Sequence, residues 1–367
     1  MMLLLIGDIG GTKTILRLVE VAEQVQSIET IQQANYRGTK TILRLVEIAE
    51  QVQSFETIQQ ANYSSSSFCD LVPMVKEFLA RVESKAPQRA CFAIAGPVIN
   101  NSSTLTNLNW HLDSKRLEQE LNLEKVDLIN DFAANSYGVL ALKESDLYPL
   151  QIGQSQPSSP IAVIGAGTGL GEGFLIPQGR FYQVFATEGG HTDFAPRNDL
   201  EMQLLQYLQH KLNTEHISVE RVVSGQGIVA IYQFLRDSNY AAESPEISAK
   251  ILNWEQQKSP KIDPAAIISQ GARVSGDRLC QKTMAMFVEA YGAEVGNVAL
   301  KLLPYGGIYL TGGVAIKNLE IMSDGRFLAS FKQKGRVSFL LENIPINLVN
   351  NVQVGLLGSI LYALQFV

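Results

Sequence analysis

The residues best suited to chemistry are Asn130 and Asp131, an amide and a carboxylate that follow an apolar run. Val126, Leu128 and Ile129 predict the end of a buried strand, and the alanines that come next favour a helix. Asp131 would therefore lie at the carboxyl edge of a sheet, where α/β proteins bind ligands. There its carboxylate could accept a proton from a substrate hydroxyl that Asn130 orients. The alternative is a structural helix N-cap, a position that Asn and Asp both favour.

Three glycine-rich turns each follow an apolar run that predicts a strand. They are Gly7-Asp8-Ile9-Gly10-Gly11-Thr12-Lys13, Gly165-Ala166-Gly167-Thr168-Gly169-Leu170-Gly171 and Leu310-Thr311-Gly312-Gly313. Glycine lets backbone N–H groups converge on an anion, and threonine hydroxyls add donors for phosphate oxygens. Any one of these turns alone could equally be an ordinary hairpin turn. None is a dinucleotide fingerprint, and the chain contains neither a P-loop nor the H-R-D motif of protein kinases.

Glu188 and His191 flank two glycines and form a second polar cluster. A carboxylate and an imidazole at this spacing offer an acceptor and a donor–acceptor at close range, which suits the hydroxyls of a sugar. A metal site is the competing interpretation, but no second His or Cys stands at ligand spacing. Glu220, before Val222-Val223-Ser224-Gly225, is a weaker candidate because a single loop carboxylate is usually just solvated.

The composition predicts a soluble cytoplasmic protein. The 367 residues are enough for two domains, and a net charge of −6 without a basic cluster argues against a nucleic-acid partner. Cys69, Cys91 and Cys280 stand far apart, which fits a reducing compartment and suggests neither zinc nor disulfides. The apolar start is too short for a signal peptide, and the apolar stretch 355–367 is too short to span a membrane.

The elements that must position these residues follow from hydrophobic periodicity. Strands are expected at 3–6, 14–21, 26–36, 90–95, 161–164 and 306–310, and helices at 68–82, 114–121, 200–212, 228–235, 265–272 and 280–303. A Ser/Pro/Gln-rich stretch at 153–160 is a plausible linker. This order predicts an α/β protein of two unequal lobes with a cleft between them.

The chain also repeats itself at a period of 27 residues. Residues 11–36 (copy one) recur as residues 38–63 (copy two), with differences only at Val21/Ile48 and Ile28/Phe55. Two copies cannot fill one strand-pair position. Because the first glycine turn leads directly into copy one, we expect copy one to be native-like and copy two to be an extra hairpin or a poorly ordered loop. An extra hairpin could extend the sheet edge and promote self-association, and a homodimer is one form to expect.

Taken together, these motifs resemble the bacterial-type glucokinase family of the sugar-kinase, heat-shock-70 and actin superfamily. The resemblance runs nearly the whole length and rests on the order and spacing of the matching stretches. They are Gly7 to Lys13, Phe92 to Pro97, Thr106-Asn107, Ile129 to Phe132, Gly165 to Gly171, Glu188 to Pro196, Glu220 to Gly225 and Leu310 to Val314. The clear departure is the duplication beside the first phosphate turn.

The resemblance implies ATP-dependent phosphorylation of the 6-hydroxyl of glucose, with Asp131 as the general base. It implies sugar binding by Asn107, Asn130, Asp131, Glu188, His191 and Glu220. It implies binding of the ATP phosphates and nucleotide by Gly7, Asp8, Gly10, Gly11, Thr12, Lys13, Gly165, Gly167, Thr168, Gly169, Gly312 and Gly313. Asp8 matches a carboxylate that holds Mg²⁺, through water because Mg²⁺ keeps several waters.

The implied fold is a two-lobed ribonuclease-H-like (actin-like ATPase) α/β fold with an interlobe cleft. The expected small lobe spans residues 1–140 and is completed by a C-terminal helix at 352–367, and the large lobe spans 141–351. Three other interpretations stay open: a kinase for another hexose, a non-catalytic sugar-sensing regulator, and an actin- or chaperone-like ATPase without a sugar. Polyphosphate as donor also stays open.

Overall fold

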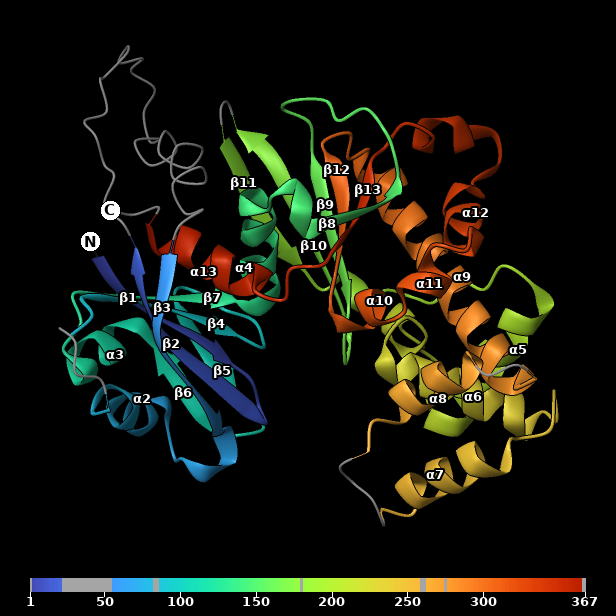
Figure 1. The fold of residues 1–367 in the computed structure, drawn as a ribbon, viewed down its shortest axis with the longest axis horizontal. Coiled ribbons are helices and arrows are strands. Elements are labelled where there is room, and N and C mark those ends of the chain that lie inside the picture. Colours follow the sequence, from blue (N-terminus) through green and yellow to red (C-terminus); the bar gives the residue numbers. More distant parts are fainter. Residues whose placement is uncertain are drawn as a thin grey trace. The chain divides into compact units, whose positions relative to one another are not determined.

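The computed structural model describes residues 2–21, 55–81, 86–178, 181–257, 262–273 and 276–364 (Figure 1). The chain divides into two compact units. The first comprises Met1–Asp146, Leu175–Ala186 and Asn351–Val367, and the second comprises Leu147–Phe174 and Thr187–Asn350. This division differs from the expected lobes in two ways: the units change at Asp146/Leu147, and residues 175–186 belong with the first unit.

The first unit contains a five-stranded sheet in the order β3-β2-β1-β4-β7. Its strands are β1 (Met2–Ile9), β2 (Lys13–Val21), β3 (Phe55–Ser64), β4 (Arg89–Ile94) and β7 (Lys125–Asn130). Strands β1, β2 and β3 are antiparallel, whereas β1, β4 and β7 are parallel. Ile9 pairs with Ile94, and Ile94 with Asn130, so the three parallel strands end at one edge. That edge carries the first glycine turn and Asp131.

The strands are buried on both faces, and alternate residues supply two separate cores. Leu5, Phe92 and Leu128 face a core shared with α2 (Leu71–Leu79) and α3 (Ser114–Leu121). Ile6, Cys91 and Ile129 face the opposite core, shared with α4 (Asp131–Gly138) and α13 (Val354–Leu364). Helices α4 and α13 pack so closely that a Cβ on Gly358 would overlap the carbonyl oxygen of Ala134. The short hairpin of β5 (Ser102–Leu105) and β6 (Trp110–Asp113) completes the unit.

Nearly all of the third strand of this sheet comes from copy two, so the expectation that copy two is surplus is wrong for residues 55–63. Strand β3 pairs with β2 of copy one, with Thr14 opposite Tyr63. The residue after β3 explains why copy two supplies this strand. Ser65 N donates to the Thr12 carbonyl at 3.0 Å, and Ser65 Oγ donates to the Gly10 carbonyl at 2.7 Å. Only copy two is followed by this serine. The strand expected at 26–36 lies outside the described residues.

A second sheet has six strands in the order β11-β10-β9-β12-β13-β8, and all of it except residues 175–186 of β10 and β11 belongs to the second unit. The strands are β8 (Leu147–Gln151), β9 (Ile161–Ala166), β10 (Leu170–Gln178), β11 (Phe181–Thr187), β12 (Gly307–Thr311) and β13 (Ile346–Val349). Strands β9, β12 and β13 are parallel, and β8 is antiparallel to β13. Thr311 pairs with Gly165, so the second and third glycine turns leave the sheet at one edge.

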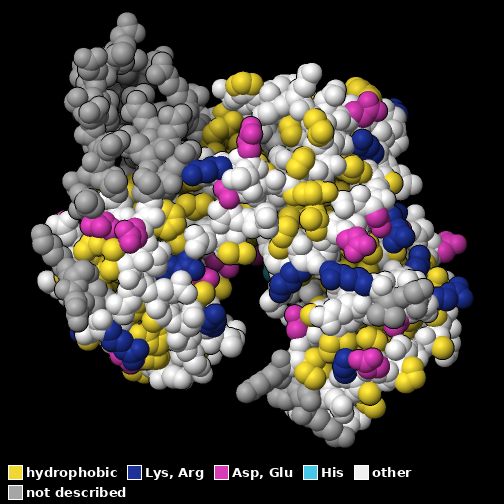
Figure 2. Space-filling view, viewed as in Figure 1, with side chains coloured by type: hydrophobic (Ala, Val, Ile, Leu, Met, Phe, Trp, Pro, Cys, Tyr) yellow, Lys and Arg dark blue, Asp and Glu magenta, His cyan; other side chains and the backbone are white. Residues whose placement is uncertain are grey.

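Helices surround the apolar core of this unit. They are α5 (Asp199–Leu212), α6 (Gly225–Asp237), α7 (Pro245–Glu255), α8 (Pro264–Ala272), α9 (Arg278–Leu302), α10 (Gly313–Lys317), α11 (Leu319–Met322) and α12 (Arg326–Lys332). The long apolar α9 is buried along most of its length, which fits its nearly continuous hydrophobic sequence. Among the described helices, none combines the length and the apolar character that a membrane span requires. On the face drawn in Figure 2, Lys and Arg side chains are interspersed with acidic and hydrophobic ones.

Candidate active site

The first glycine turn connects β1 to β2. Gly10 N donates to the Lys13 carbonyl at 3.0 Å, and Gly11 lies against Asn107, since a Cβ on Gly11 would be 3.6 Å from Asn107 Nδ2. Thr12 is exposed within the turn, and Lys13 begins β2. The predicted phosphate residues Gly10 to Lys13 and the predicted sugar residue Asn107 therefore lie together. Gly7 instead lies inside β1, where a Cβ would crowd the ring of Phe92.

Asp8 lies next to this turn, and part of its surface is open to solvent while its carboxyl group is partly enclosed. The surrounding protein desolvates it and raises its pKa, while the charges of Arg17 and Lys13 oppose that rise. The described residues hold no group of three or more His, Cys, Asp or Glu side chains that could bind a metal. A single carboxylate nevertheless fits Mg²⁺, which is typically bound by one or two carboxylates together with substrate phosphates and water.

Asn130 and Asp131 lie where β7 passes into α4. Asn130 is the N-cap: its Oδ1 accepts from Phe132 N and Ala133 N, both at 3.0 Å, and its Nδ2 donates to the Gly96 carbonyl at 3.0 Å. Asp131 is the first helical residue, and its Oδ1 accepts from Phe132 N at 2.8 Å. The capping interpretation therefore holds for Asn130, whereas Asp131 follows it at the same sheet edge as the first turn.

In the second unit the other two glycine turns interlock. Gly167 N donates to the Gly169 carbonyl at 2.8 Å, and Gly225 N donates to the Gly167 carbonyl at 2.8 Å. Gly312 has a φ of +87°, and a Cβ there would overlap the carbonyl oxygen of Ala166. Glycine is needed at this position for both reasons. Gly165 and Ala166 end β9, and Gly313 begins α10.

A cavity of about 850 Å³ opens beside these two turns. Gly167, Thr168 and Gly313 line it together with residues of α5, α6, α7 and α8. Its volume lies within the range of small-molecule and cofactor sites, and its lining is mainly apolar with a few cations. Lys211 and Lys317 are two of those cations. Glycine turns, apolar walls and lysines together fit a nucleotide whose phosphates meet the turns.

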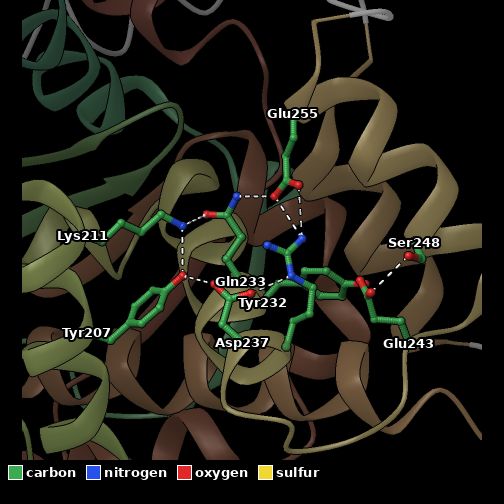
Figure 3. A network of polar contacts seen from close by, with 9 residues as sticks. Tyr207, Lys211, Tyr232, Gln233, Asp237, Glu243, Ser248 and Glu255 are labelled. Atoms are coloured by element: carbon green, nitrogen blue, oxygen red, sulfur yellow. Dashed lines mark hydrogen bonds and ion pairs between the residues drawn. The ribbon is translucent and has the colours of Figure 1, made fainter.

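A closed network of polar contacts supports the wall of this cavity (Figure 3). Lys211 and Gln233 line the cavity, and Lys211 Nζ donates to Gln233 Oε1 at 2.7 Å and to the Tyr207 hydroxyl at 3.0 Å. Gln233 Nε2 donates to Glu255 Oε1 at 2.7 Å, and Arg236 pairs with the same carboxylate at 3.0 Å. Burial lowers the pKa of Lys211. The network joins α5, α6 and α7 and so fixes the position of the Lys211 charge.

Glu188 and His191 lie on an exposed turn of the second unit. Glu188 precedes a short 3₁₀ helix, Gly189–His191, and its Oε2 is 3.7 Å from His191 Nε2. Both side chains reach solvent and so remain available to a ligand. The Thr192 carbonyl accepts from Val219 N at 2.8 Å, which ties the turn to the segment that carries Glu220.

Glu220 contacts the second glycine turn directly. Its Oε2 accepts from Leu170 N at 2.9 Å, and a Cβ on Gly169 would overlap that oxygen. Glu220, which is predicted to bind the sugar, and Gly169, which is predicted to bind phosphate, are therefore neighbours. Glu172, which was not among the predicted site residues, is buried beneath the Glu188–His191 turn. The one available signal was an acidic residue inside a glycine-rich strand.

The comparisons with known proteins agree on one family. A family model described as Glucokinase matches residues 37–366. The glucokinase of Nostoc punctiforme is 52% identical over 366 residues and the glucokinase of Synechocystis is 46% identical over 375 residues, covering 99% and 98% of both chains respectively. The crystal structure of a glucokinase from an Antarctic psychrotroph is similar with a TM-score of 0.76 and 27% identity, covering 99% of each chain. This α/β protein with an actin-like ATPase fold therefore belongs to the glucokinase family.

Proposed function

We propose that this protein is a glucokinase that transfers the γ-phosphate of ATP to the 6-hydroxyl of D-glucose, the first step of glycolysis. The observation that carries the proposal is the shared edge of the first sheet. The register of β1, β4 and β7 brings Asp131 and the first glycine turn to the same edge. A proton acceptor beside a phosphate-binding turn is the arrangement that phosphoryl transfer to a hydroxyl requires.

The chemistry assigned to Asp131 is that of a general base. Its carboxylate accepts the proton of the sugar hydroxyl as that oxygen attacks phosphorus, and the bond from phosphorus to the ADP oxygen breaks. Asn130 uses its hydrogen bonds to Phe132, Ala133 and Gly96 to fix the start of α4. Its Nδ2 also donates to Asp131 Oδ1 at 3.3 Å, so it orients the Asp131 carboxylate directly.

The remaining site residues divide between sugar and nucleotide. We assign Asn107, Glu188, His191 and Glu220 to the sugar hydroxyls. The cavity beside the second and third turns receives the nucleotide, with its phosphates at Gly165, Gly167, Thr168, Gly169, Gly312 and Gly313. Gly10, Gly11, Thr12 and Lys13 of the first turn face the transferred phosphate, and Gly7 keeps β1 close to Phe92. Backbone N–H groups in such turns neutralise developing charge without a large reorganisation.

Asp8 is the residue that would hold Mg²⁺, through a water molecule. When bound, the ion neutralises charge on the phosphate oxygens. Asp8 contributes an accessible carboxylate. Burial raises its pKa, and the nearby charges of Arg17 and Lys13 oppose that rise.

The cellular setting completes the proposal. We infer a cytoplasmic enzyme with glucose and ATP as its partners, acting without a membrane or a nucleic acid, and a homodimer as one assembly open to it. The first unit would serve as the small lobe and the second as the large lobe of a sugar kinase.

Activity across a panel of hexoses tests this proposal. ADP release is followed by a coupled assay with ATP and Mg²⁺ and with glucose, mannose or fructose as acceptor. The expected result is a kcat/KM for glucose that exceeds the values for the other hexoses. A higher value for another hexose would reassign the substrate, and sugar binding without turnover would indicate a regulator.

A further inference from the structure

Glu172 is a buried carboxyl group directly beneath the turn that carries Glu188 and His191. It lies in β10 and is 3% exposed, and its Oε1 has no hydrogen-bond partner in the described part of the chain. Its other oxygen lies against Gly189, because a Cβ built on Gly189 would overlap Oε2 and lie 2.7 Å from Cδ. The backbone of one half-buried glycine therefore covers this carboxyl group.

The turn is also tied to the backbone of the same strand. Thr187 Oγ1 donates to the Glu172 carbonyl at 3.1 Å and accepts from Gly189 N at 3.2 Å. Gly190 packs against the carbonyl of Leu170, where a Cβ would overlap the oxygen. Any displacement of Gly189 by the Glu172 side chain is therefore transmitted to Glu188 and His191, its neighbours in the turn.

The titratable groups that face Glu172 within the described residues come from α9. They are Glu294, Lys301 and Tyr291. Burial and the neighbouring Glu294 raise the pKa of Glu172 to about 7, and Lys301 opposes that rise. Glu294 itself accepts from Asn297 Nδ2 at 3.0 Å and lies near the charge of Lys334. Glu172 Oε1, in contrast, has no such hydrogen-bond partner among the described residues, so the ionised form of Glu172 is disfavoured.

We propose that Glu172 is a positioning residue of the sugar site, which holds the Glu188–His191 turn in its binding geometry while protonated and loosens it when ionised. A buried carboxylate with an unpaired oxygen is unfavourable. Because Gly189 lies against the other oxygen of Glu172, a movement of the ionised side chain toward water would displace this turn. This inference rests on the proposed function, because it takes Glu188 and His191 as sugar ligands. It adds a dependence of sugar affinity on the protonation of a residue that does not touch the sugar.

The sign of the effect follows from protonation. Below pH 7 the carboxyl group is protonated and the turn is competent, and above pH 7 the competent fraction falls. If only the protonated form binds, the apparent Kd rises in inverse proportion to that fraction, or about tenfold between pH 6 and pH 8. The matching variant is Glu172→Gln, which keeps the size of the side chain and cannot ionise.

Isothermal titration of the full-length protein with glucose, without ATP, tests the proposal between pH 6 and pH 8. The wild type should lose affinity about tenfold, and Glu172→Gln should change less than about twofold over the same range. His191 is also a titratable group of the turn and is present in both proteins. The decisive quantity is therefore the difference between the pH profiles of the wild type and of Glu172→Gln. Glu294→Gln provides a second readout: it removes the charge that raises the Glu172 pKa, so its affinity should fall at a lower pH.

Glu201→Gln is the matched control. Glu201 is 2% exposed in the same unit, but its carboxylate is paired with Arg197. Its variant should lose stability and keep the wild-type pH profile. Equal profiles for wild type and Glu172→Gln, or an unshifted profile for Glu294→Gln, would overturn the role of Glu172 and leave the kinase assignment intact. Failure of the wild type to bind glucose at any pH would overturn both.

Discussion

Two adjacent side chains at the end of β7 take different parts in the proposed reaction. Asn130 Oδ1 accepts two backbone hydrogen bonds and its Nδ2 donates to the Gly96 carbonyl, so Asn130 fixes the point where β7 passes into α4. Asp131 begins the helix with its carboxylate at the helix N-terminus, where negative charge is favoured. From the sequence, a helix cap and a catalytic base were alternative interpretations of this pair. In the structure Asn130 is the cap, and the next residue, Asp131, is the proposed base.

Substitution of Asp131 by Asn should lower kcat by about 10²–10⁴-fold, the usual range for a general base. Glucose should still bind, because the amide keeps the shape of the side chain and one acceptor for Phe132 N. Steady-state kinetics and calorimetric glucose binding measure the two effects separately. A variant that retains kcat within about threefold of wild type would remove Asp131 from the proton transfer.

Sequence reasoning found the exposed and turn residues more readily than the buried ones. Glu188, His191 and the glycine turns stand out because their types and spacing are unusual. Glu172 does not, because its burial depends on α9, whose Glu294 is more than a hundred positions away in the chain. The contact of Glu220 with Leu170 was hidden for the same reason, since a carboxylate in a loop gives no sign of its partner.

At the scale of elements, the helices with a clear periodic apolar pattern were predicted, whereas α7, α10, α11 and α12 were not. The helix predicted at 114–121 is α3, and those predicted at 200–212, 228–235, 265–272 and 280–303 correspond to α5, α6, α8 and α9. Strand β3 was assigned to the wrong copy. The two copies carry nearly the same strand sequence, so local pattern could not choose between them. The choice rests on Ser65, which follows only copy two and bonds to the Gly10 turn.

Deletion of residues 12–38 should leave a folded and fully active enzyme. Gly11 then meets Thr39, and Lys40–Ile48 replaces β2 with one change, Val21 to Ile48, while β3 and Ser65 are retained. Residues 49–54 remain as the connection between the strands, and a shorter connection closes at slightly lower entropic cost. Circular dichroism, thermal unfolding and the glucose-dependent rate measure the outcome.

Deletion of residues 22–54 is the contrasting variant. It joins Val21 directly to Phe55, two residues that pair across β2 and β3, and so leaves nothing to form a turn. This protein should be insoluble or strongly destabilised. If deletion of 12–38 also abolished folding, both copies would be structural and the account of the first sheet would be wrong.

At the scale of the whole molecule, the proposed chemistry is divided between the two units. The first holds Asp131, Asp8 and the first glycine turn, and the second holds the nucleotide cavity and the Glu188–His191 turn. Each set lies at one edge of its own sheet, as expected for ligand sites in α/β proteins. The fold class was predictable because the glycine turns and the alternation of strands and helices run through the whole sequence. The unit boundary was less predictable, because residues 175–186 join the first unit through packing such as that of Val184.

The identity of the product decides whether this protein phosphorylates glucose at the 6-hydroxyl. The purified protein is incubated with ATP, Mg²⁺ and glucose, and phosphorus NMR with carbon-13-labelled glucose locates the transferred group. We predict phosphate on the 6-hydroxyl, formed in equal amount with ADP and absent when glucose is omitted. ADP formed at the same rate without any sugar phosphate, or glucose bound without either product, would contradict the account.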